Sequence, residues 1–138
     1  MNDLTLPLEE RQQLILWAAA CVERLLPVFV DEQPDDLRLA NALEGAKQFA
    51  AGNLSVGAMR TLAFDCHAAA REASQPAATA VARACGQGAA IAHMAGHSRN
   101  IVGYTSKALS GQSLEEELDW QRTQLPVQFR SYVYGQIV

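Results

Sequence analysis

Apolar residues in the first thirty positions recur every three or four residues, which is the repeat of an α-helix. They form one stripe, made of Leu14, Trp17, Ala18, Cys21, Leu25 and Phe29. Pro7 suits the first position of this helix because it has no amide hydrogen to leave unpaired. Pro27 lies inside the stripe and predicts a kink or a fresh helical turn. The chain therefore begins with a long amphipathic helix that must bury one face.

Similar stripes predict helices along the rest of the chain. Two of them, within residues 31–53 and 55–75, end at Gly52-Asn53 and Gln75-Pro76, and Ser55 is placed to cap the second. Further predicted helices run from Pro76 towards Gly96, from Ser98 to Leu109, and onward from a capping box at Ser113–Glu116. Residues 127–138 alternate as a strand would, but a lone strand has no partner, so we expect a helix there too.

The segment from Pro76 to Gly96 places Gly86 and Gly88 inside a helix. Each glycine costs about 1 kcal/mol relative to alanine, so a compensating contact is expected. Ala82, Gly86, Ala89 and His93 share one stripe, which would let a neighbouring helix approach closely. We therefore predict an all-α fold: one compact domain over residues 1–138, a bundle of about five to seven helices with an Ala/Gly-rich central pair.

Several classes of protein are excluded by what the chain lacks. Cys21, Cys66 and Cys85 have no CxxC spacing, which argues against zinc and redox sites. The uncharged stretch at residues 84–94 is too short to span a bilayer, and acids lie where a secretion signal would be basic. No phosphate-binding or dinucleotide-binding glycine motif is present. We therefore expect a cytoplasmic protein with no cofactor, no metal, no membrane contact and no catalytic residues.

Charge is distributed unevenly along the chain, although the net charge is only −4. Residues 1–50 carry nine acids against four bases, and residues 51–110 carry two acids against five bases. The pattern indicates acidic outer helices around a basic central pair. A nucleic-acid surface normally needs a denser basic stripe, so we do not expect nucleic-acid binding.

All three histidines lie in the basic middle of the chain. His93 and His97 are four residues apart, a spacing that places two imidazoles on one helical face, where His67 or Asp65 would have to supply a third metal ligand. The glutamate of a zinc-protease HExxH motif is missing. The helix should also end near His97, which would make the two rings diverge. We therefore favour a packing role for His93, and for His97 a position at the helix end where it interacts with the free carbonyls.

His67 shares a helical face with Arg60 and Arg71, which disfavour its protonated form and suit either a base or an ordinary hydrogen-bonded side chain. We take His67, Arg71, His93 and His97 as the first candidate functional patch. A second candidate is an acidic interaction patch made of Asp31, Glu32, Asp35 and Asp36. Neither these acids nor the run Glu115, Glu116, Glu117 and Asp119 matches a calcium loop, and solvated helix starts explain both groups.

Four stretches carry a family resemblance that covers nearly the whole chain. They are "LILWAAACVERLLPVFVDEQPDDLRLANALEGAKQFAAG", "AFDCHAAAREA", "AIAHMAGHSRNIVGYTSKAL" and "DWQRTQLPVQFRSYV". Together they resemble a bacterial all-α family of putative immunity proteins of polymorphic toxin systems. The resemblance implies a small cytoplasmic protein that binds and neutralises a partner toxin, and it brings no catalytic residues with it.

Three functions remain open from the sequence. The first is an immunity-type protein that neutralises a toxin through protein–protein interaction. The alternative is a small histidine-dependent metal-binding or acid–base enzyme, since every histidine falls in two neighbouring helices. The third is a helical protein that associates with copies of itself.

Overall fold

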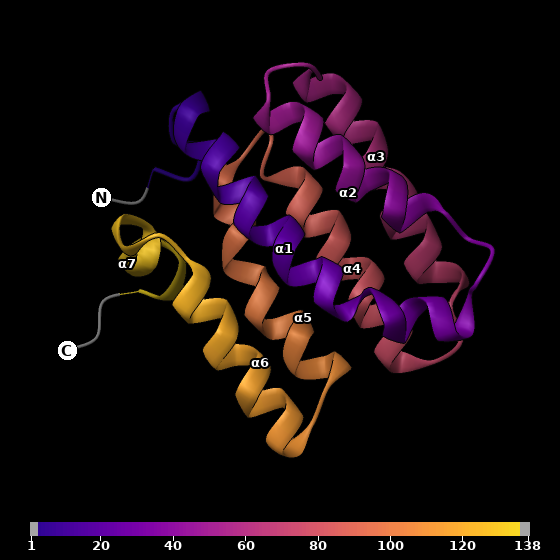
Figure 1. Cartoon of the computed structure of the whole chain (residues 1–138). Helices are drawn as coiled ribbons and strands as arrows, with labels where there is room; N and C mark the ends of the chain where they lie inside the picture. The colour runs from indigo at the N-terminus through magenta and orange to yellow at the C-terminus, as the bar shows by residue number, and fades with distance from the viewer. Residues whose placement is uncertain (1–2, 136–138) are drawn as a thin grey trace.

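The structure, a computed structural model, describes residues 3–135 and holds only helices within that range (Figure 1). The α-helices are α1 (Leu8–Glu32), α2 (Arg38–Ala50), α3 (Val56–Glu72), α4 (Pro76–Ala90), α5 (Ile101–Ala108), α6 (Gly111–Gln124) and α7 (Arg130–Tyr134). Two short 3-10 helices, η1 (Ala95–Asn100) and η2 (Val127–Phe129), precede α5 and α7. The predicted all-α bundle is confirmed. So is the helical character of residues 127–134, whereas residues 136–138 lie outside the described part of the chain.

The bundle is organised around α1 and α4, which pack against each other (Figure 1). On one side α2 and α3 cover this pair, and on the other side lie α5 and then α6. Fully buried side chains come from helices throughout this arrangement, including Leu14 and Phe29 of α1, Met59 of α3 and Val81 of α4. The amphipathic stripes read from the sequence therefore converge on one hydrophobic core.

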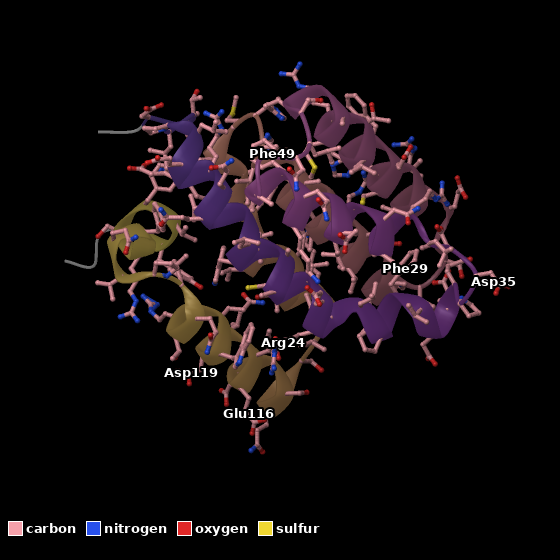
Figure 2. All side chains as sticks on the ribbon, turned by 45° about the horizontal axis from the view of Figure 1, so that its top comes forward. Arg24, Phe29, Asp35, Phe49, Glu116 and Asp119 are labelled. Carbon is pink, nitrogen blue, oxygen red and sulfur yellow. The ribbon has the colours of Figure 1, made fainter. Side chains whose placement is uncertain are left out.

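The first helix follows its predicted pattern and buries every member of the predicted stripe. Pro7 stands immediately before its first residue, and the helix continues through Pro27 to Glu32. Its ribbon changes direction just past Arg24 (Figure 2), in the turn where a proline removes a hydrogen bond and crowds the preceding carbonyl. Pro27 thus bends the helix without ending it.

The same helix is also long and apolar enough, by length and composition, to cross a bilayer. Among residues 3–135, no other helix is long and apolar enough to do so, including the segment at residues 84–94. In the bundle, half of the apolar stretch of α1 is buried against the other helices.

The small residues of α4 allow close contacts on two sides. A Cβ atom placed on Gly86 would lie 2.7 Å from Cε1 and Nε2 of His67, so the imidazole of α3 rests directly on this glycine. On the other side, a Cβ on Gly88 would meet the Cβ of Ala18 in α1 at 3.5 Å. Burial against both neighbours offsets the poor helix propensity of the two glycines, as the sequence predicts.

The predicted end of α4 is wrong, because the helix stops at Ala90 and not near Gly96. Residues 91–93 form a turn, and Met94 is extended. The amides of Ala95 and Gly96 then donate to the carbonyl oxygens of Thr5 (3.3 Å) and Leu4 (2.8 Å). These contacts replace the hydrogen bonds that a longer helix would have made, and a local sequence pattern does not reveal them.

The predicted capping box of α6 is also wrong. The helix begins at Gly111, whose φ of 62° is in the left-handed region that favours glycine, and Ser113 already lies in its first turn. The Ser113 hydroxyl donates to the carbonyl of Ser110 (3.2 Å) and so does not cap the helix.

Polar contacts dominate the docking of α6 onto α1 and α5. The indole nitrogen of Trp17 donates to the carbonyl of Gln121 (2.8 Å), and the Gln121 amide donates to the Thr105 hydroxyl (2.9 Å). Arg24 pairs with the Glu117 carboxylate at 2.7 Å and lies 4.0 Å from the centroid of the Trp120 ring. The prediction that Glu117 belongs to a solvated run of acids is therefore wrong, because its side chain is buried against Arg24. Glu116 and Asp119 do point away from the bundle (Figure 2).

Candidate functional site

The three imidazoles predicted as part of a functional patch lie close together between α3, α4 and η1. His67 and Arg71 lie one turn apart on α3, His93 follows α4 in a turn, and His97 belongs to η1. The rings of His93 and His97 meet edge to face, with centroids 5.2 Å apart. The prediction that these rings diverge is therefore wrong, because the chain turns between them instead of continuing as a helix.

Hydrogen bonds fix the tautomers of two of these rings. Arg83 is only a donor, so its Nη1, 3.0 Å from Nδ1 of His67, requires that nitrogen to accept. Nδ1 of His97 lies 2.8 Å from Oε1 of Gln87, an oxygen that also accepts from Asn100 at 2.8 Å, so His97 must donate. His67 and His97 are therefore held as opposite neutral tautomers.

The environment of the cluster does not resemble a built metal site. Within residues 3–135, no group of three or more His, Cys, Asp or Glu side chains is arranged to hold an ion. Nδ1 of His67 is occupied by Arg83, whose positive charge would repel a cation. Over the same range, neither His67 nor His97 is hydrogen-bonded to a hydroxyl, thiol or carboxylate. The arrangement presents hydrogen-bonding and cationic groups rather than an activated nucleophile.

Burial lowers the pKa of all three histidines below the usual 6.5. For His67, the charges of Arg83, Arg71 and then His97 lower the pKa further. For His93, the additional charges are those of Arg60, His97 and Arg11. All three imidazoles are therefore neutral at pH 7, in agreement with the sequence-based expectation for His67.

We expect the free energy of unfolding to fall as the pH is lowered through 6.5 towards 5. In this range the unfolded chain binds protons at histidines whose pKa is 6.5, while the folded chain, with lower pKa values, does not. Each such proton changes the stability by at most about 1.4 kcal/mol per pH unit. Urea denaturation at pH 7.5 and 5.5 measures the effect. The difference should shrink in a His67→Gln, His97→Gln variant, and an unchanged difference would contradict the assignment.

The predicted acidic patch is only partly free for an interaction. Asp31 is exposed, and so is Asp35 at the turn between α1 and α2 (Figure 2). The Glu32 carboxylate instead accepts from the amides of Ser74 (3.0 Å) and Gln75 (2.6 Å), in the linker between α3 and α4, and these hydrogen bonds lower the pKa of this carboxyl. Asp36 pairs with Arg38 at 2.8 Å, and that hydrogen-bonded guanidinium lowers the pKa of Asp36. Two of the four acids therefore stabilise the fold.

A neighbouring cleft, missed by the sequence analysis, adjoins the histidine cluster. It lies between the start of α4 and the end of α5, has a volume of about 430 Å³, and is lined by Arg83, Tyr104 and Lys107 among others. A second cleft of about 320 Å³ shares Tyr104 and Lys107 and adds Arg99. One feature of the sequence could have indicated this basic region: no Asp or Glu occurs from residue 73 to residue 114.

Comparison with known proteins gives one family match. The sequence profile of a family described as "Imm-5 like putative immunity protein" matches residues 4–128, which includes every helix from α1 to α6. No curated protein and no solved structure gives a significant match to the chain.

Proposed function

Because the chain belongs to the Imm-5 like putative immunity protein family, we propose that it binds a partner toxin protein in the cytoplasm and neutralises it by covering a surface that the toxin needs. The observation that carries the proposal is the extent of the family match, residues 4–128. The match includes both the helices that build the core and the segments that bear the histidine cluster and the neighbouring cleft.

The fold supports a role as a preformed binder. Its core holds large, fully buried side chains from several helices, and α4 contacts α1, α2, α3 and α5. Proteins whose binding surface rests on a well-packed core usually bind with little change in backbone shape. The uneven distribution of charge along the chain, with acids in excess before residue 51 and bases in excess over residues 51–110, also favours recognition of one particular partner.

Co-expression with the toxin encoded by an adjacent gene tests the proposal. We expect the wild-type chain to restore growth of a bacterial host that expresses the toxin, and the two purified proteins to form a complex on size-exclusion chromatography. A Leu14→Asp variant, which places a charge at a fully buried position, should fail in both assays because it does not fold. Failure of the folded wild-type chain to protect or to form a complex would contradict the proposal.

The histidine-dependent alternative predicts a different result. Elemental analysis of the purified wild-type protein and of a His93→Ala variant discriminates between the two functions. If the chain acts only by binding a toxin, we expect no stoichiometric metal in either protein. Stoichiometric zinc, iron or manganese that is present in the wild type and lost in the variant would support the alternative.

A further inference from the structure

We propose that the toxin docks on a cationic surface formed by Arg60, Phe64 and Arg71 of α3, Arg83 of α4 and Lys107 of α5, and that it presents an acidic protein surface there. This inference rests on the proposed function and adds the binding surface and the chemistry of the partner. We call these five residues the cationic surface.

Helical geometry places the three α3 residues on one exposed face. Positions 60, 64 and 71 lie within a narrow sector of the helix at roughly 100° per residue, and all three side chains are exposed. Phe64 is 68% exposed, which is unusual for a large aromatic residue that contributes nothing to the core. The acids of α3, Asp65 and Glu72, lie on a different flank of the helix, and Glu72 is paired with Arg38.

Arg83 connects this face of α3 to the cleft between α4 and α5. Its guanidinium contacts His67, which lies one turn from Phe64 and one turn from Arg71 on α3. Arg83 also lines the cleft of about 430 Å³ together with Tyr104 and Lys107. The surface therefore continues from the exposed face of α3, across the imidazole of His67, into the cleft.

Among residues 3–135, the cations of this surface have no acidic partner. Over residues 3–135, ion pairs join Arg24 to Glu117, Lys47 to Glu23, and Arg38 to both Asp36 and Glu72. None of them involves Arg60, Arg71, Arg83 or Lys107. An exposed aromatic residue flanked by unpaired arginines has the composition of an interface hot spot, and carboxylates on a partner would complete it.

Charge also favours an acidic protein over a nucleic acid. The chain as a whole carries a net charge of −4, and acids predominate before residue 51 and after residue 110. A polyanion that extends beyond the cationic surface would meet these acids, whereas a compact acidic patch on a protein need only cover the cationic surface itself.

Affinity measurements on four single variants test the assignment. Calorimetric titration with the toxin encoded by the adjacent gene, in an inactive form, is made for Phe64→Ala and Lys107→Glu. Their matched controls are Val127→Ala, at a 72% exposed apolar position, and Arg130→Glu, at an exposed position of α7. We expect each test variant to weaken binding at least about tenfold and the controls to remain within about twofold of wild type. Circular dichroism confirms that all four variants fold.

Three outcomes would overturn the assignment. If both test variants bind as tightly as wild type, the toxin docks elsewhere, while the proposed function stands. If the wild-type chain does not bind the toxin at all, the proposed function fails and this inference fails with it. If a labelled DNA or RNA duplex binds the wild-type chain tightly and Lys107→Glu removes that binding, the partner is a nucleic acid.

Discussion

A Trp17→Ala variant is expected to lose about 3–5 kcal/mol of unfolding free energy, the usual cost of truncating a buried tryptophan. Trp17 is only 4% exposed, and its indole fills space between α1 and α6. The substitution also removes the donor that bonds to the Gln121 carbonyl at 2.8 Å. Both losses act on the same contact, so the docking of α6 should weaken together with the core.

Urea denaturation followed by circular dichroism measures this loss. The matched control is Leu16→Ala, one residue earlier on the same helix, where the side chain is 47% exposed. Its effect should stay within about 0.5 kcal/mol. If the two substitutions cost similar amounts, α1 does not bury the face that we describe.

The same substitution, glycine to alanine, is expected to have clearly different effects on stability at Gly103 and Gly86. Gly103 lies inside α5 with open space around a Cβ atom, so Gly103→Ala should stabilise the protein by up to about 1 kcal/mol through helix propensity. At Gly86 the added Cβ would meet the His67 ring at 2.7 Å. Displacing that ring opposes the gain in propensity, and we expect Gly86→Ala to be about 1–3 kcal/mol worse than Gly103→Ala.

A double-mutant cycle identifies the cause of that difference. In a His67→Ala background the ring is gone, so Gly86→Ala should become as favourable as Gly103→Ala. Thermal unfolding of the four proteins in the cycle gives the coupling energy. Additive effects would show that the imidazole does not limit the space above Gly86.

Local patterns predict the helices well where the signal is local. Ser55 caps α3 as expected, with its hydroxyl accepting from the amide of Ala58 at 3.1 Å. Gly52 follows α2 with a positive φ of 83°, a conformation that costs glycine little. The helix predicted within residues 55–75 buries Met59, Ala63, Cys66 and Ala70, since these side chains need only a hydrophobic partner and not a particular one.

The errors arise where residues distant in sequence meet. The end of α4 depends on carbonyls of Leu4 and Thr5. Likewise, the Glu32 carboxylate binds the amides of Ser74 and Gln75, more than forty residues later in the chain. The candidate site shows the same division. Periodicity places His67 and Arg71 on one face, but only the folded chain shows that Arg83 bonds to His67 and that the rings of His93 and His97 touch.

The way α6 is attached sets where this molecule can tolerate change. Its two buried positions, Glu117 and Gln121, are polar, and water can form hydrogen bonds similar to those that they make. Displacing α6 would uncover Trp17 of α1 but no fully buried apolar side chain of α6 itself, whereas displacing α4 would expose the hydrophobic core. The exposed face of α6 can therefore be rebuilt while the helices beneath it remain fixed, provided that the cover over Trp17 is kept.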